Sequence, residues 1–537
     1  MNYELCGRHL VEGRWIAAAT GGGDTFEAIN PATGAALAPK FAEATPGEVD
    51  AALSAAREAF LAVRDRDPRW PAELLEAIAA QIEALGDPLL ERGELETALP
   101  RPRLTSERAR TCTQLRMFAE IVREGSWVEA VIDLGDAKRQ PLPKPDLRRM
   151  LRPRGPVVVF GASNFPFAFG ACGGDTASAL AAGNPVIVKG HPSHPGTSEL
   201  FASAVAAALD ERNLPAGLVA LLQGRRHELS GWLVQHPQTQ AVGFTGSHRA
   251  GRALFDLASR RELPIPVYAE MGSVNPVVIL PAAMRERGEA IAKELSASLL
   301  LGGGQFCTKP GIVFVVGDDQ RRFIDSLARE VQAAPKVTML NRSLRDTFAE
   351  RAASLSNESG VKTVVAGKAS DHASHAPALF ETTADVFLRE PRLHEEAFGP
   401  AGIVVRCDSV EQALRCIESL GGNLTGTVHV GSGEDPSLAA GVLRSLEDSV
   451  GRVIVNGYPT GVEVCHAIVH GGPYPATTDS GTTSVGSAAI RRFVRPIAYQ
   501  NLPQGLLPRA LRNDNPLGIM RLVNGDWTDR VIERQTR

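Results

Sequence analysis

The segment LLLGGGQFCTKPG (299–311) places a single cysteine, Cys307, shortly after a run of glycines and Gln305. Glycines let backbone amides come close to a substrate. Oriented amides, together with the nearby cation of Lys309, would favour the thiolate form of the cysteine. Most single cysteines are buried and inert, but few lie in a loop of this composition. The segment therefore predicts Cys307 as a nucleophile.

Two other polar residues lie beside predicted strands. Glu270, in VYAEMGSVNP (267–276), precedes a strand among small and apolar residues, where partial burial would raise its pKa and make it a useful base. A solvated loop carboxylate is the alternative. Asn164, in FGASNFPFAFG (160–170), follows a strand and could donate its amide to an oxyanion. The alternative is a turn residue before Pro166.

Two further segments could hold a phosphorylated cofactor. In PVIVKGHPSHPG (185–196), Lys189 ends a buried strand, where a charge either reaches solvent or binds a ligand. His191 and His194 are three residues apart, but the surrounding prolines break any helix, so no metal site is predicted. FTGSHRAG (244–251) is a Gly–Ser turn into a helix, which suits phosphate oxygens, although the chain contains no GxGxxG motif.

The elements that must position these residues alternate between strands and helices. The 537 residues exceed a single core, because single domains usually stop growing near about 250–300 residues. Helical periodicity from 46 to 125 precedes an extended crossing at 133–154. Short β-branched runs without polar alternation then predict two parallel sheets covered by helices. The first series is 155–160, 185–189, 217–223 and 240–244, and the second is 276–280, 311–316, 402–407 and 451–457.

Charge and cysteine content exclude several classes of protein. A net charge of -4 and a pI near 6.3 predict no nucleic-acid and no membrane partner. The seven cysteines are odd in number and form no CxxC pair, so neither a disulfide framework nor a zinc ribbon is expected. The N-terminal residues lack the pattern of a signal peptide, and no run of about 18 apolar residues occurs. A cytoplasmic location is expected.

Taken in order, the motifs resemble those of the aldehyde dehydrogenase superfamily over nearly the whole chain. The segments at 173–200 and 470–496 resemble the branch of α-ketoglutaric semialdehyde (2,5-dioxovalerate) dehydrogenases, which also contains NADP-preferring long-chain aldehyde dehydrogenases. The motifs are INPATG (29–34), SNFP (163–166), PVIVK (185–189), FTGS (244–247), EMGSVNP (270–276), GGQFCT (303–308) and EEAFGP (395–400).

The resemblance implies a role for each matching residue. Cys307 matches the nucleophile, Glu270 the general base, and Asn164 with the Cys307 amide the oxyanion hole. The implied reaction oxidises an aldehyde to a carboxylic acid through a thiohemiacetal and a thioester. Four residues match cofactor contacts: Lys189 for the adenosine ribose, Ser247 for the phosphates, Glu396 for the nicotinamide ribose and Phe398 for the nicotinamide ring.

One departure from the family pattern bears on the choice between NAD and NADP. Many relatives carry a glutamate three residues after the ribose lysine, but this chain carries Pro192 there. No acid at that position repels a 2′-phosphate, and His191 and Arg225 could attract one. NADP is therefore the preferred cofactor, with NAD as the alternative. Arg225 could instead be a solvated loop residue.

The resemblance implies an α/β fold with a Rossmann-like cofactor domain, an α/β catalytic domain and a small β oligomerisation element. The oligomerisation element would pair with another subunit in a homodimer or homotetramer. We expect the cofactor domain at 1–134 and 154–266, the catalytic domain at 267–480, the oligomerisation element at 135–153 and 481–500, and a C-terminal tail at 501–537.

The preferred substrate is a small aldehyde that carries a carboxylate, held by an arginine or an amide donor in the substrate tunnel. A long-chain or broad-range aldehyde dehydrogenase is the alternative. An acylating enzyme would pass the thioester to coenzyme A without needing Glu270. A non-catalytic relative would be expected to lose Cys307 or Glu270, but both residues are present.

Overall fold

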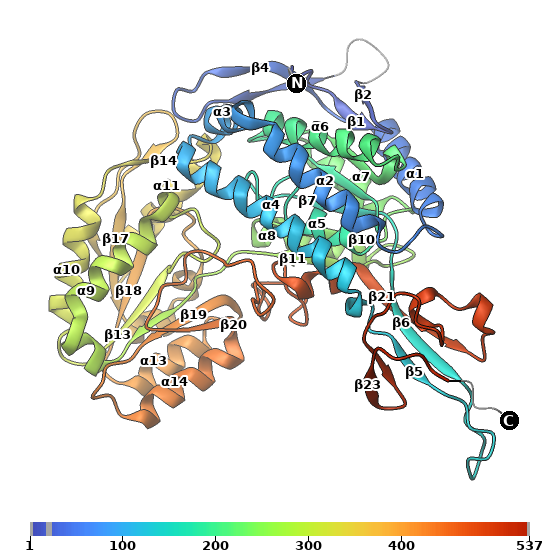
Figure 1. Cartoon of the computed structure of the whole chain (residues 1–537). Coiled ribbons are helices and arrows are strands. Elements are labelled where there is room, and N and C mark those ends of the chain that lie inside the picture. Colours follow the sequence, from blue (N-terminus) through green and yellow to red (C-terminus); the bar gives the residue numbers. More distant parts are fainter. Residues whose placement is uncertain (1–3, 18–23, 534–537) are drawn as a thin grey trace.

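The computed structural model describes residues 4–17 and 24–533, so the outermost residues of the predicted segments 1–134 and 501–537 lie outside the described residues. Two seven-stranded sheets with helices packed around them form the body, and a third sheet projects from it as an arm (Figure 1). This architecture confirms the predicted α/β fold. None of the described helices is long and apolar enough to cross a membrane.

The first sheet has the order β11-β10-β7-β8-β9-β1-β2. The five strands β7 to β11 run parallel to one another. Parallel strands are covered on both faces, which explains their uninterrupted apolar sequences. The strands are β1 (His9–Val11), β2 (Arg14–Ile16), β7 (Val157–Phe160), β8 (Val186–Lys189), β9 (Val219–Leu222), β10 (Ala241–Thr245) and β11 (Val267–Glu270). The helices are α1 (Pro46–Ala62), α2 (Trp70–Ala84), α3 (Gly86–Thr97), α4 (Arg101–Glu124), α5 (Gly174–Ala181), α6 (Pro195–Glu211), α7 (His227–Gln235) and α8 (His248–Ser259).

The second sheet has the order β15-β17-β18-β13-β12-β19-β20, and only the edge strand β15 is antiparallel. Its strands are β12 (Val277–Ile279), β13 (Ile312–Val316), β15 (Lys362–Val365), β17 (Ala378–Thr383), β18 (Ala401–Cys407), β19 (Asn423–His429) and β20 (Val450–Val455). Its helices are α9 (Pro281–Leu300), α10 (Gln320–Ala333), α11 (Arg342–Ser356), α12 (Ala384–Arg389), α13 (Val410–Glu418) and α14 (Pro436–Ser449).

The arm is a third sheet of order β21-β6-β5-β22-β23. A separate hairpin of β3 and β4 crosses the N-terminal side of the body (Figure 1). The strands are β3 (Thr25–Ile29), β4 (Ala36–Ala42), β5 (Val131–Asp133), β6 (Leu147–Pro153), β21 (Val494–Gln500), β22 (Arg521–Val523) and β23 (Asp526–Thr528).

Strand pairing differs from the predicted boundaries at two places. β11 pairs with β10, so the first sheet extends past residue 266 to Glu270. β5 and two strands of the predicted tail join the arm, because β22 pairs with β5 and β23 pairs with β22. Backbone pairing brings these segments together across the chain, and no local pattern in the sequence indicates it. The assignment of functions to the domains remains a prediction.

Candidate functional site

Five predicted site residues lie at the carboxyl edge of the first sheet. Glu270 ends β11, Ser247 follows β10, Asn164 follows β7, Lys189 ends β8, and Arg225 follows β9. Because these strands are parallel and adjacent, their carboxyl ends share one edge, where open α/β sheets bind ligands. The sequence order of the five residues differs from their order along the edge, since the helical crossovers rearrange the strands.

The loop that carries Cys307 follows α9, a helix of the second sheet. Residues 302–304 are all glycines with φ of 58°, 70° and 66°, a left-handed backbone that favours glycine. A Cβ on Gly304 would lie 2.1 Å from the carbonyl oxygen of Gly399. The glycines are therefore required by a tight turn against the neighbouring backbone. The sequence had indicated a different reason, close approach of amides to a substrate.

Two asparagines fix this loop relative to the sheets. Asn275 donates its side-chain amide to the carbonyls of Cys307, at 2.8 Å, and Lys309, at 2.9 Å. Asn164 donates to the carbonyl of Gln305 at 2.9 Å and keeps a second side-chain N–H. The loop carrying Asn164 and the loop carrying Cys307 are thus held together.

Cys307 lies in a cluster with Glu270, His470 and Ser484. The His470 Nε2 atom lies 2.9 Å from Glu270 Oε1 and 3.4 Å from Cys307 Sγ. The Ser484 hydroxyl donates to Glu270 Oε2 at 2.8 Å. The ligand atoms of Glu270, Cys307 and His470 lie within 4.8 Å of one another, so the same cluster could bind a zinc ion. The side chains of His470 and Glu270 are almost fully buried.

Burial and charge set the protonation of this cluster. Burial raises the pKa of Cys307 well above its ordinary value, and the Glu270 carboxylate adds to the shift. Burial alone would also raise the pKa of Glu270, but His470 and hydrogen bonds from His470, Ser484 and Cys307 hold it below its ordinary value. The expected rise in the pKa of Glu270 is therefore wrong, because the histidine and these hydrogen bonds together outweigh burial. The thiol is protonated in the resting site.

Lys309 does not support the thiolate as expected. Its ammonium group is buried and donates to the carbonyls of Ala397 at 2.6 Å and Ala401 at 2.8 Å. Burial lowers the pKa of Lys309 to about 8, and Glu396 opposes that shift. Lys309 thus connects the cysteine loop to the backbone at the start of β18, and its ammonium group binds carbonyl oxygens there rather than the thiolate.

His470 and Ser484 were not predicted from the sequence. Both belong to the segment 470–484, which follows β20 and runs along the edge strand β11. Glu270 forms an isolated bridge with Thr477, and Met271 N–H donates to the carbonyl of Ala476. The motif HGGPYPATTD, which begins at His470, indicated family membership but gave no role to its histidine. The only signal in the sequence was a histidine followed by two glycines.

The proposed adenosine end contains an acid that the sequence did not reveal. Glu43 is buried, accepts the backbone N–H of Arg225 at 2.9 Å, and lies 3.5 Å from its Nε. Burial lowers the pKa of Lys189 to about 8, and Glu43 opposes that shift. His191 stacks on His194, and burial, then the charges of His194 and Lys189, lower its pKa well below the ordinary value. His191 can therefore offer a neutral N–H to a phosphate and no charge, and Arg225 is already paired.

The predicted nicotinamide contacts come from the loop before β18. Glu396 and Phe398 are both partly buried. Burial raises the pKa of Glu396 to about 7, and the nearby Lys309 opposes the shift. A Cβ on Gly272 would lie 2.5 Å from Glu396 Oε2, so a glycine there admits the carboxylate. The loop therefore faces the segment that follows β11, across from the edge of the first sheet.

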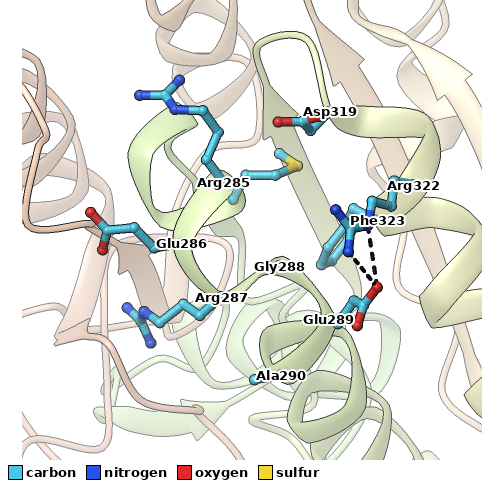
Figure 2. Close-up of a pocket in the computed structure, with 10 residues that line it drawn as sticks. Arg285, Glu286, Arg287, Gly288, Glu289, Ala290, Asp319, Arg322 and Phe323 are labelled. Atoms are coloured by element: carbon cyan, nitrogen blue, oxygen red, sulfur yellow. Dashed lines mark hydrogen bonds and ion pairs between the residues drawn. The ribbon is translucent and has the colours of Figure 1, made fainter.

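A pocket of about 280 Å³ lies away from this cluster, between the start of α9 and α10 (Figure 2). Among its lining side chains, Arg322 pairs with Glu289 at 2.8 Å, as the dashed lines show. The pocket shares no residue with the Cys307 cluster. The pocket is therefore separate from the candidate site at the sheet edge.

Comparison with known proteins gives concordant matches. The profile of the Aldehyde dehydrogenase family matches residues 15–493. Alpha-ketoglutaric semialdehyde dehydrogenase 2 of Azospirillum brasilense is 48% identical over 525 residues, covering 97% of this chain and 99% of that protein. Alpha-ketoglutaric semialdehyde dehydrogenase of Acinetobacter baylyi is 44% identical, with the same coverage of both chains.

Solved structures share the fold at lower sequence identity. Gamma-glutamyl-gamma-aminobutyraldehyde dehydrogenase from Burkholderia cenocepacia superposes with a TM-score of 0.79 at 24% identity, covering 93% of this chain and 97% of the other. NADP-dependent glyceraldehyde-3-phosphate dehydrogenase from Bacillus halodurans, complexed with NADP, gives a TM-score of 0.78 at 20% identity, covering 93% and 99%.

Proposed function

Because this chain belongs to the aldehyde dehydrogenase family, and is therefore an oxidoreductase acting on aldehydes, we propose that it oxidises α-ketoglutaric semialdehyde to 2-oxoglutarate. The two relatives named for this substrate support the choice, since each matches 97% of the chain. The cluster of Cys307, Glu270 and His470 carries the chemistry, because it places a thiol beside a paired carboxylate and imidazole that can take up its proton.

The first step requires the thiol of Cys307 to lose its proton. His470 Nε2 pairs with Glu270 Oε1 at 2.9 Å, and both groups lie within 4.8 Å of the sulfur, so this pair can accept that proton. The thiolate then attacks the aldehyde carbon and forms a thiohemiacetal. The free N–H of the Asn164 side chain and the backbone N–H of Cys307 are the donors for the resulting oxyanion.

A bound nicotinamide cofactor would supply the acceptor for the hydride that leaves the former aldehyde carbon. Cys307 would then carry a thioester. Once the proton of the thiol has passed to solvent, Glu270 removes a proton from the water that hydrolyses the thioester. His470 and Ser484 keep Glu270 ionised and oriented, since each contacts a different carboxylate oxygen. The products are the carboxylic acid and the free thiol.

The residues present fit a nicotinamide dinucleotide. The ammonium group of Lys189 forms no hydrogen bond or ion pair with the residues that the structure describes, 4–17 and 24–533, and Glu396 Oε1 is buried without a partner there. Lys189 would hold the adenosine ribose and Ser247, at the N-terminus of α8, the phosphates. Glu396 and Phe398 would hold the nicotinamide ribose and ring.

NADP is the preferred cofactor in this proposal. Pro192 supplies no carboxylate after Lys189, and the guanidinium of Arg225 is 59% exposed, so it can turn from Glu43 to a 2′-phosphate. Arg225→Ala should then raise the KM for NADP roughly tenfold while leaving that for NAD unchanged. Arg226→Ala is the matched control, since Arg226 pairs with Asp24. Equal or better kcat/KM with NAD in the wild type would refute the preference.

A steady-state screen tests the proposed substrate. We expect the highest kcat/KM for α-ketoglutaric semialdehyde, compared with pentanal and with a long-chain aldehyde, and no stimulation by coenzyme A. A higher value for the long-chain aldehyde would favour the broad-range alternative. A turnover that requires coenzyme A would favour an acylating enzyme.

Each of the three large sheets has a different role in this proposal. The first sheet would bind the cofactor, the second would carry the nucleophile, and the arm would join subunits of a homodimer or homotetramer. Both β21, at the edge of the arm, and β20, at the edge of the second sheet, lack a neighbour on one side among the described strands, and such edges pair readily. Multi-angle light scattering of the purified chain tests the assembly.

The seven free cysteines suit a reducing compartment, and we place the enzyme in the cytoplasm.

A further inference from the structure

An arginine with no part in the reaction steps lies beside the reactive cluster. The Arg110 guanidinium of α4 lies over the ring of Phe169, 5.3 Å from its centroid. The Phe169 ring is in turn 6.0 Å from the ring of His470, whose Nε2 contacts Cys307. Burial lowers the pKa of Arg110, and the charges of Glu107, Cys307 and other nearby acids oppose the shift. An arginine keeps its charge at neutral pH, so its cation acts electrostatically on the nucleophile.

The hydrogen-bonding groups of Arg110 are mostly unused. Its two terminal nitrogens, Nη1 and Nη2, are buried and have no hydrogen-bond partner within the described ranges 4–17 and 24–533. Its Nε makes one long contact of 3.4 Å with the carbonyl of Val462. Leaving such donors unpaired in a buried site is costly, which indicates a ligand that pairs with them.

Two other arginines near the site differ in this respect. Arg103, one heptad earlier on α4, donates Nη2 to the carbonyl of Asn164 at 2.8 Å. Arg452 donates Nη2 to the carbonyls of Pro459 at 2.7 Å and Gly461 at 3.0 Å. Both therefore hold loops of the protein itself. Of the three, Arg110 alone presents both terminal nitrogens without a protein partner.

We propose that Arg110 binds the carboxylate of the substrate, at the end opposite the reacting aldehyde. The planar fork of a guanidinium donates two parallel hydrogen bonds to a carboxylate. In α-ketoglutaric semialdehyde the carboxylate carbon is four bonds from the aldehyde carbon, or roughly 5 Å when extended. Phe169 packs against the guanidinium and orients it. The inference rests on the proposed function, and it names the residue that selects an aldehyde acid.

Substitution of Arg110 tests this assignment with two substrates of equal chain length. With Arg110→Gln, kcat/KM for α-ketoglutaric semialdehyde should fall ten- to a hundredfold, mainly through KM, because charge-assisted hydrogen bonds are lost. The value for pentanal, which has no carboxylate, should stay within about twofold. Arg110→Lys keeps the charge without the fork and should lose less. Arg116→Gln is the matched control, since Arg116 lies on the same helix as Arg110 and forms an exposed ion pair with Glu83 of α2.

A binding measurement separates recognition from catalysis. 2-Oxoglutarate, the proposed product, should raise the melting temperature of the wild type and of Arg116→Gln but not of Arg110→Gln. If both aldehydes lose equal efficiency in Arg110→Gln, or the stabilisation persists, the role of Arg110 is refuted. If the wild type itself shows no preference for the aldehyde acid over pentanal, the proposed function fails instead. Should Arg110→Gln not fold, an Arg110→Lys variant with unchanged preference would also refute the role.

Discussion

Replacing His470 by asparagine removes the imidazole between Glu270 and Cys307. Its Nε2 lies 2.9 Å from Glu270 Oε1 and 3.4 Å from Cys307 Sγ, in a side chain that is 1% exposed. A hydrogen bond to a charged group contributes about 1.5–3 kcal/mol, which corresponds to roughly ten- to a hundredfold in rate. We therefore expect His470→Asn to lower kcat/KM at neutral pH by that factor.

The same substitution should move the pH profile in a defined direction. His470 holds the pKa of Glu270 below its ordinary value, so without it burial raises that pKa and protonates the base at higher pH. The acid limb of the kcat profile then moves to higher pH. A carboxyl group whose pKa is lowered in the folded state stabilises the fold at pH values above its unfolded-state pKa. This stabilisation is lost as the pH falls through the folded-state pKa. The loss in free energy of unfolding should therefore be larger at neutral than at acidic pH.

Stopped-flow measurement of reduced cofactor separates the steps that His470 supports. We expect a slower burst, because the pair that accepts the thiol proton loses one member, and a slower steady state, because Glu270 loses its partner. His466→Asn is the matched control, since His466 lies shortly before His470 in the chain and is exposed. An unchanged burst rate together with an unmoved acid limb would refute the role assigned to His470.

Two further predictions concern the nucleophile and the cofactor site. Cys307→Ser should abolish turnover while NADP binding, followed by fluorescence titration, stays nearly intact, because a hydroxyl is a far weaker nucleophile at neutral pH. A variant that keeps more than about a tenth of wild-type kcat, a barrier change under about 1.4 kcal/mol, would contradict it. Since burial lowers the pKa of Lys189 to about 8, NADP binding should weaken by up to about tenfold as pH rises through that value, because the charged donor is lost. Lys189→Gln should bind with little pH dependence, and identical profiles for both proteins would exclude Lys189 as the titrating group.

The sequence was most informative where a feature depends on local pattern. The runs at β7, β8 and β13 are aliphatic because both faces of a parallel strand are covered, and they were predicted at nearly their true positions. β19 was missed, although all seven of its residues are buried, because NLTGTVH alternates small and polar residues with aliphatic ones. β11 was missed because it is only four residues long and contains a glutamate.

The site was predictable in part for the same reason. Cys307 and Glu270 lie in motifs that show their chemistry locally, but the partners that tune them do not. His470 reaches Glu270 only because the segment 470–484 crosses the edge strand β11, far away in the sequence. Glu43 approaches Arg225 in the same way, from the hairpin side of the first sheet. Lys309 is adjacent to the cysteine in sequence, yet its side chain turns to carbonyls near β18.

Covalent trapping of the substrate tests the central claim most directly. In Glu270→Gln, the thioester on Cys307 should form but hydrolyse slowly, because the base that activates water is gone. Mixing the variant with α-ketoglutaric semialdehyde and NADP should give a burst of about one reduced cofactor per site. Mass spectrometry of the digested protein should then find the acyl group on the peptide that contains Cys307. An acyl group on another cysteine, or a normal steady-state rate with no adduct, would contradict the mechanism.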